Sequence, residues 1–427
     1  MKAGFAEIDI SPEYFPIRTY RITPGEVNEI LDPVYVHAAV FSDGTECIAF
    51  LSMDIVIIEQ EYADAIREKA SIETGIPKSN ILVCATHNHA CPAVIERVSF
   101  QKEERYINFM IEKSIKALKR AFENMKDSEI GIASGFEGRV SFNRRFIKRD
   151  GTVISQPSIS TLSDDILCNE GPIDPELGVI SIREKDGKIS GIIVNFASHA
   201  CHHMGEISAG YPGVLCKKIK EFYGNDTVLV FLNGACGNII HRNYSDAQYK
   251  DTKEKIGSIL AEDVKKIISE KILYREDCRI SAEEKNLSLK YRDYSDLEEA
   301  VRNNKFVNVF SSLVKIGWYQ HDLEKLKKLH SKSKEAQVPV QVFKIGNTAF
   351  ASVPGEYFTE LGLEIKEKSK AEHTYVVTLA NGWLGYVPAK KSFSRKGGHE
   401  TCTGWSQKMD YNVGDIIAAE IIKLINK

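Results

Sequence analysis

Two histidines separated by one residue are the part of this sequence best suited to chemistry. His87 and His89 follow the apolar run Ile81–Ala85, which has the length of a buried strand. In open α/β sheets, ligands bind in the crevice beyond the carboxyl ends of the strands. Imidazole is the commonest metal-binding side chain and the proton carrier that titrates nearest neutral pH. The motif therefore indicates a metal site or acid–base catalysis, and the alternative is a pair of ordinary loop histidines.

The same pattern of an apolar run followed by a polar loop recurs four more times. The runs and their loops are Gly191–Ala197 with Ser198–His203, Thr227–Leu232 with Asn233–Asn238, Ala349–Val353 with Pro354–Glu356, and Tyr375–Leu379 with Ala380–Trp383. Asn-Gly and Pro-Gly form turns, so each loop alone has an ordinary structural explanation. Histidines on two of the loops and a carboxylate on a third favour one site at the rim of a sheet.

The elements that must position these loops follow from the hydrophobic periodicity. Strands are predicted at Gly4–Ile10, Pro33–Phe41 and Cys47–Met53, and helices at Glu59–Thr74 and Tyr106–Met125. Residues 127–190 are predicted to form short strands and an irregular excursion. Residues 293–336 are charged and rich in helix formers, which predicts a solvent-facing helical insertion or lid. The fold class predicted is α/β, with a mixed or mostly parallel sheet flanked by helices and the active site at the strand-end loops.

The composition narrows the class of protein. The chain has 427 residues, 43% of them hydrophobic, and a net charge of -3, so it has no basic excess for nucleic acid. No run approaches the ~18 apolar residues of a membrane span, and the first residues show no apolar signal segment. Nine cysteines without a Cys-x-x-Cys spacing predict reduced thiols. We expect a cytoplasmic protein with a small-molecule substrate and no stable membrane anchor.

Several loops together resemble the catalytic domain of the neutral, non-lysosomal ceramidases, a family of zinc-dependent amidases. The matching segments, in order, are Ala85–His89, Asn195–His199, Asn233–Asn238, Pro354–Glu356 and Ala380–Val387, and Ile8–Pro12 looks like the family's opening strand. The resemblance implies a single zinc hydrolase domain over residues 1–427, with residues 293–336 as an insertion within it. The family's C-terminal immunoglobulin-like domain is expected to be absent.

The resemblance also implies the roles of particular residues. The family's zinc ligands fall on His87, His199, Glu356 and Tyr386. His89 matches a second, catalytic histidine. Arg144, in Asn143-Arg144-Arg145, matches an arginine close to the reacting carbonyl.

The chain departs from the family at two positions of the implied site. Ile240 stands where ceramidases have a serine near the metal, and His399-Glu400 is the nearest match to a tyrosine–glutamate pair. These changes put ceramide in doubt more than zinc. His202, His203 and His241 are interpreted as hydrogen-bonded loop histidines near the site. Cys91, Cys201 and Cys236 lie beside the motifs and are interpreted as buried, inert thiols.

The expected chemistry follows from the ligand types. Zinc accepts nitrogen and oxygen ligands, and a catalytic site keeps one position for water, whose pKa falls to ~7. His89 would transfer protons, and Arg144 or His399 would stabilise the developing oxyanion. We therefore expect a zinc-dependent amidase acting on a small polar N-acyl substrate. The alternatives are a zinc hydrolase of an ester or sugar linkage, a true ceramidase, and a non-catalytic metal-binding homologue.

Overall fold

The computed structural model describes residues 1–21, 25–157, 164–303 and 316–427. Its centre is an eight-stranded sheet with the strand order β14-β13-β12-β7-β1-β4-β5-β6. These strands are β1 (Lys2–Asp9), β4 (Tyr35–Ser42), β5 (Cys47–Met53), β6 (Ile81–Ala85), β7 (Lys126–Phe136), β12 (Glu176–Glu184), β13 (Ile189–Phe196) and β14 (Val228–Asn233). Only the pairs β5–β6 and β13–β14 are parallel, and the other five pairs are antiparallel. The prediction of a mixed α/β sheet is confirmed.

A second sheet packs against the first, which the periodicity did not predict. It has the order β16-β17-β18-β20, with β16 (Ile280–Lys290), β17 (Glu335–Ile345), β18 (Thr348–Val353) and β20 (His373–Thr378). Phe41 and Phe50 of the first sheet share a buried cluster with Phe343 and Phe350 of the second. The two sheets approach each other closely where Gly178 of β12 faces Tyr375 of β20. A Cβ atom at Gly178 would lie 2.2 Å from the ring of Tyr375.

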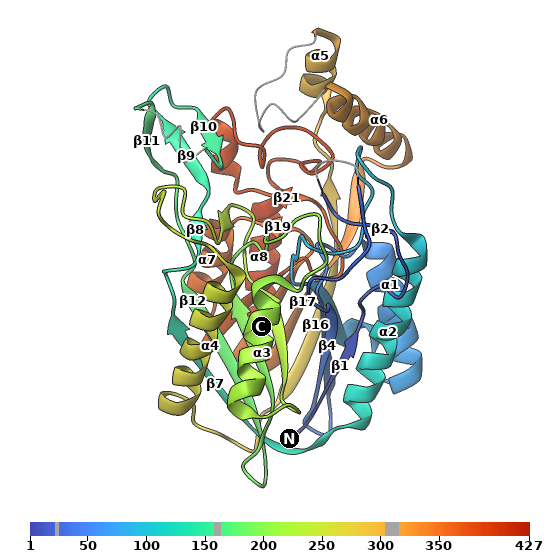
Figure 1. Cartoon of the computed structure of the whole chain (residues 1–427), viewed down its shortest axis with the longest axis vertical. Coiled ribbons are helices and arrows are strands. Elements are labelled where there is room, and N and C mark those ends of the chain that lie inside the picture. Colours follow the sequence, from blue (N-terminus) through green and yellow to red (C-terminus); the bar gives the residue numbers. More distant parts are fainter. Residues whose placement is uncertain (22–24, 158–163, 304–315) are drawn as a thin grey trace.

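Helices cover the outer faces of both sheets (Figure 1). Helices α1 (Gln60–Thr74) and α2 (Glu104–Glu123) cover one half of the large sheet, and α3 (Gly210–Tyr223) and α4 (Lys253–Glu270) cover the other. Helices α7 (Thr359–Lys368) and α8 (Val413–Ile425) pack on the smaller sheet. The result is a layered α/β/β/α structure. Among the described residues, no helix combines the length and apolar character needed to cross a membrane.

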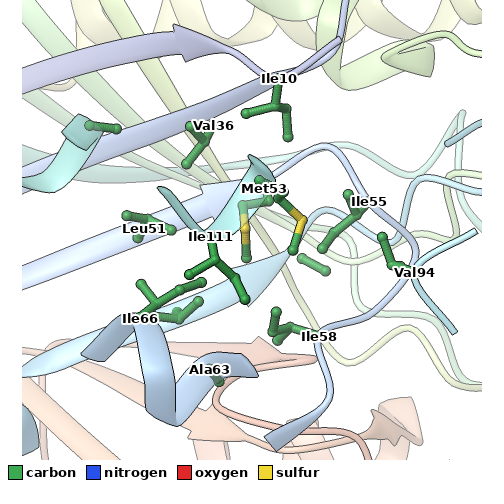
Figure 2. Close-up of a cluster of buried hydrophobic side chains, with 14 of the residues drawn as sticks. Ile10, Val36, Leu51, Met53, Ile55, Ile58, Ala63, Ile66, Val94 and Ile111 are labelled. Atoms are coloured by element: carbon green, nitrogen blue, oxygen red, sulfur yellow. The ribbon is translucent and has the colours of Figure 1, made fainter. Parts of the chain in front are cut away.

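The first two predicted helices form for the reasons that the sequence suggests. Helix α1 ends at Gly75, whose φ of 76° gives the left-handed C-terminal cap that glycine adopts without strain. Figure 2 shows how α1 and α2 turn apolar side chains such as Ile66 and Ile111 toward Leu51 and Met53 of β5. This core includes Ile55 and Ile58 of the loop that follows β5. It therefore fixes a backbone segment that reaches the candidate site.

Residues 127–190 differ from their prediction. They contain β7 and β12, which are long strands in the middle of the large sheet, together with β8 (Phe142–Asn143) and the strands β9 (Arg145–Lys148), β10 (Val153–Ser155) and β11 (Ile166–Asn169). The prediction of only short strands was wrong because both faces of β12 are covered. Such a strand shows no polar alternation.

Helices α5 (Ser295–Asn303) and α6 (Ile316–Lys332) connect β16 to β17. They lie at the end of the molecule remote from the N-terminus (Figure 1). Residues 304–315 of the predicted insertion lie outside the described residues. The remaining short strands are β2 (Ile17–Arg18), β3 (Glu26–Val27), β15 (Ile239–Ile240), β19 (Glu356–Tyr357) and β21 (Tyr386–Val387), and single 3-10 turns occur at Lys78–Asn80 and Lys390–Ser394.

Candidate functional site

The candidate site lies where three parallel strand pairs end. His87 follows β6, His199 follows β13, and Glu356 follows β18 after two residues. The loops after β14 and β20 complete the rim. Parallel neighbours have their carboxyl ends at the same edge, so these pairs direct their loops to one place although the sheets are largely antiparallel.

Three asparagines of the loops hold them together. The Asn88 Nδ2 donates to the carbonyls of Asp54, Ala90 and Ser208 at 3.1, 3.2 and 2.7 Å. The Asn233 Nδ2 donates to the carbonyls of Thr86 and Ser198, each at 3.0 Å, and so joins the two histidine loops. Asn381 exchanges two bonds with the backbone of Val83, which joins the two sheets. These residues do more than form turns.

The backbone at His87 is in a conformation that a non-glycine residue rarely adopts. Its φ is 65°, which costs of order 1–3 kcal/mol and persists only where the surroundings impose it. The His87 Nδ1 lies 2.8 Å from the carbonyl oxygen of Val56. A carbonyl only accepts, so this contact places the proton on Nδ1 and leaves Nε2 as a bare acceptor.

His199 has the same arrangement. Its Nδ1 lies 2.6 Å from the carbonyl oxygen of Cys236, so its Nε2 is also without a proton. The two rings are 4.3 Å apart between centroids. The Nε2 atoms of His87 and His199 lie 3.4 and 3.3 Å from the same carboxylate oxygen, Oε2 of Glu356.

Three acceptors therefore face one another in the protein interior. The Nε2 of His199 and the Oε2 of Glu356 are buried and make no hydrogen bond. Acceptor atoms held this close repel unless a cation or a proton lies between them. The arrangement fits a divalent metal ion, for which two imidazole nitrogens and a carboxylate oxygen are suitable ligands.

The carboxylate of Glu356 is oriented by a neighbouring indole. Its second oxygen accepts a hydrogen bond of 3.1 Å from the indole Nε1 of Trp383. The indole therefore orients the carboxylate toward the two histidines.

Tyr386 is brought next to Glu356 by strand pairing. The short strands β19 and β21 are parallel, and Glu356 is the register partner of Tyr386. Residues in register on neighbouring strands point to the same face. The Tyr386 hydroxyl accepts a hydrogen bond of 3.1 Å from Arg144. Glu356 thus lies in a strand and not at a helix N-terminus, since α7 begins at Thr359.

Arg144 is the centre of a buried charged network beside Glu356 and Tyr386. Its Nε donates to Glu400 at 2.9 Å, and its Nη2 donates to the carbonyl of Gly237 at 2.8 Å. Glu400 also accepts from Arg145 at 2.9 Å. The Nε2 of His399 lies 3.4 Å from the Arg144 Nη2. Burial lowers the pKa of His399 to about 3, so its imidazole is neutral at physiological pH.

His89 lies beside the three acceptors and reaches open space. Its Nε2 is 3.3 Å from the Nε2 of His87, and its buried Nδ1 has no hydrogen-bond partner. Burial, and then repulsion by His87 and His199, lower its pKa well below the usual value. The imidazole is therefore neutral, and it would readily release any proton that it accepts.

Among the described residues, three other groupings of candidate ligands fit a metal less well. In one of them Cys201 lies within reach of His89 and His199, but burial raises the pKa of its thiol to about 12. Cys236 lies within reach of His87 and His199, but burial raises its thiol pKa far above neutrality. His202 and His241 gather near Asp251, but their rings are stacked at 3.7 Å and 16°. Stacked rings direct their lone pairs side by side instead of toward one point.

The other side chains that the sequence placed near the site are a histidine, two cysteines and an isoleucine. His203 forms a half-exposed ion pair of 2.9 Å with Glu206. Burial raises the pKa of Cys91 and Cys201 to about 12, so both thiols are protonated at neutral pH. Ile240 is buried in β15 and is the bridge partner of His199.

Two cavities meet at these residues. A small cavity of about 20 Å³ is bordered by His87, His89, Glu356, Trp383 and Tyr386. A larger pocket of about 370 Å³ opens beside it. The larger pocket is lined by His89, Arg144, Ile240, Tyr386 and His399 on the site side, and by Trp318, Tyr319, His321, Asp322 and Lys325 of α6 on the opposite side.

Several of these residues were missed by sequence reasoning. The motif that contains Trp383 predicts no role for its indole, and the pattern predicts Glu400 only as the neighbour of His399. Helix α6 was predicted to face solvent, yet one of its faces lines the larger pocket. An apolar or charged residue facing a pocket gives the same periodicity as one facing a core, so the sequence held no signal for it.

The comparisons with known proteins support the fold. No protein-family model matches the sequence, and no curated protein matches it either. The solved neutral ceramidase from Pseudomonas aeruginosa superposes with a TM-score of 0.73 at 15% identity, over 99% of this chain and 73% of that chain. A ceramidase complexed with C2 gives 0.75 and 15%, over 99% and 74%. The expected resemblance is confirmed for the fold, which is that of the solved neutral ceramidase.

Proposed function

We propose that the protein is a zinc-dependent hydrolase, most simply an amidase. The observation that carries the proposal is the convergence of three atoms that carry no protons. The Nε2 atoms of His87 and His199 lie 3.4 and 3.3 Å from Oε2 of Glu356. A stability role alone gives no reason to bury three mutually repelling acceptors. The shared fold with a neutral ceramidase favours amide hydrolysis over other zinc chemistry.

The proposed zinc ligands are His87, His199, Glu356 and Tyr386. When bound, zinc supplies a Lewis acid and lowers the pKa of a coordinated water to ~7. The carbonyls of Val56 and Cys236 fix both imidazoles in the tautomer that a metal requires.

The protein's own groups would divide the remaining work. His89 borders both cavities, so it can accept a proton on the side of the metal and release it toward the larger pocket. Arg144 positions the Tyr386 hydroxyl and lines the pocket, where its charge favours an oxyanion. His399 is neutral and lies against Arg144, which suits it to donate or accept a hydrogen bond with the substrate.

The proposed substrate is a small polar N-acyl compound and not ceramide. The reason is the altered pocket wall, where Ile240 and His399 replace a serine and a tyrosine implied by the resemblance. We also propose that residues 1–427 form one catalytic domain with residues 293–336 as its insertion, because α5 and α6 connect two strands that pair with each other.

The proposal is tested with one panel of substrates. Zinc-loaded protein is assayed on long-chain ceramide, on short N-acyl amides, on the matching esters and on aryl glycosides. We expect turnover of the short amides above the rest. Turnover confined to the esters or glycosides would replace the amidase assignment, and zinc binding without any turnover would support a non-catalytic homologue.

A further inference from the structure

Arg97 is a half-buried cation at the junction of the two cavities. Its Nη1 donates to the hydroxyl of Ser406 at 2.7 Å, and its Nη2 donates to the hydroxyl of Tyr20 at 3.3 Å. Its guanidinium also lies over the rings of Tyr20 and Trp383, at 5.8 and 5.5 Å from their centroids. Two hydroxyls and two rings hold the side chain in place, and none of these four groups carries a formal charge.

Most other cations of the larger pocket are neutralised by a carboxylate. The ion pairs are Arg144–Glu400 at 2.9 Å, Arg242–Asp251 at 2.9 Å and Lys325–Glu96 at 3.2 Å. Within the described residues, Arg97 and Arg21 form no ion pair with a carboxylate, and Asp322 and Glu356 act on Arg97 only through longer-range electrostatics. Arg21 borders only the larger pocket, whereas Arg97 also borders the small cavity.

The position of Arg97 relates it directly to the proposed metal ligands. Trp383, over which it lies, donates to Glu356, and the small cavity that it borders is lined by His87 and His89. An anionic group bound by Arg97 would therefore lie beside the cavity that the proposed metal ligands border. Guanidinium groups bind carboxylates through paired, charge-assisted hydrogen bonds.

The opposite side of the larger pocket carries three aromatic side chains beside the charged side chains of Asp322 and Lys325. Trp318 and Tyr319 of α6 and Trp405 line it. The backbone N–H of Trp405 donates a hydrogen bond of 2.8 Å to the carboxylate of Asp322, which holds Trp405 in this place. Aromatic walls of this kind bind apolar groups by burial and stacking. The pocket thus offers an apolar region beyond the metal and a cation close to it.

We propose that the substrate carries a carboxylate next to the scissile amide, as an N-acyl amino acid does, and that Arg97 binds this carboxylate. The inference rests on the proposed hydrolase function and names its substrate class. Hydrolysis adds water across the amide: the C–N bond breaks, the acyl carbon gains oxygen and leaves as a carboxylic acid, and the nitrogen takes the proton and leaves as the amino acid. The acyl chain would occupy the aromatic side of the pocket.

The test compares two substrates that differ only in the charged group. N-octanoylglycine carries the carboxylate, and N-octanoylglycinamide carries a neutral amide in its place; octanoate release is measured for both. The proteins are the zinc-loaded wild type, Arg97→Gln, Arg97→Lys and a surface control, Arg183→Gln. Arg183 lies on β12 in an ion pair with Glu129, outside the residues that border either cavity.

We expect the wild type to prefer N-octanoylglycine. Loss of one charge-assisted pair should raise KM for this substrate about 10- to 100-fold in Arg97→Gln, with the neutral substrate little changed. The KM of Arg97→Lys should fall between those of the wild type and Arg97→Gln, because lysine keeps the positive charge but cannot form paired hydrogen bonds with a carboxylate. The KM of Arg183→Gln should match that of the wild type. Equal turnover of both substrates by the wild type, or an equal loss on both in Arg97→Gln, would overturn the inference.

A binding measurement separates this inference from the hydrolase proposal. If the wild type hydrolyses neither substrate, calorimetric titration with N-octanoylglycine still reports the carboxylate site. Binding that is lost in Arg97→Gln would support the anion site while refuting the proposed activity. Absence of binding to the wild type would refute the anion site.

Discussion

Replacing Trp383 by phenylalanine tests whether the indole orients a metal ligand. Trp383 is nearly buried and donates to Glu356 Oε1 at 3.1 Å, while the other carboxylate oxygen has no hydrogen bond. Phenylalanine keeps most of the ring packing but removes the N–H. A hydrogen bond to a charged group contributes about 1.5–3 kcal/mol, and partners of metal ligands typically change metal affinity about 10- to 100-fold. We therefore expect the zinc Kd to rise by about that factor.

The assay is competition for zinc with a chromophoric chelator, followed by elemental analysis at saturating zinc. Trp383→Phe should bind zinc more weakly but reach the same stoichiometry as the wild type. Trp405→Phe is the matched control, because the Nε1 of Trp405 is buried without a hydrogen-bond partner. Both indoles also contact Lys408, at 4.4 and 4.9 Å from the ring centroids, so loss of that contact is common to the two variants. Equal zinc affinity in the two variants would refute the reasoning.

Three further outcomes follow from single groups. His89→Ala should retain zinc and lose turnover by ~10²–10⁴-fold, since the proposed role of His89 is proton transfer; loss of zinc would make it a ligand instead. Gly237→Ala should weaken zinc binding and lower the melting temperature, because its Cβ would lie 2.4 Å from the carbonyl oxygen of Glu356, whereas Gly317→Ala, with open space around its Cβ, should not. Burial lowers the pKa of His37 to about 4, so the unfolded chain binds a proton that the folded protein excludes between about pH 4 and 6.5. Stability should therefore fall as pH falls through this window, and His37→Gln should reduce that slope; an unchanged slope in denaturant titrations would count against it.

Local patterns in the sequence were sufficient to predict much of the scaffold. The apolar runs before His87 and His199 form β6 and β13, and the predicted helix Glu59–Thr74 forms α1 within one residue. Side-chain type alone marked the imidazoles and the carboxylate as candidate ligands. These features can be predicted from the sequence because hydrophobic periodicity is determined by a few consecutive residues.

Long-range contacts decided everything else about the site. Glu356 lies far along the chain from His87 and His199, and only the packing of the second sheet on the first brings the three acceptors together. The tautomers of the histidines depend on carbonyls of distant loops, and the unpaired charge of Arg97 depends on which acids the fold places elsewhere. Periodicity records that a side chain is buried, but it does not record its partner, so these relations exist only in the tertiary structure.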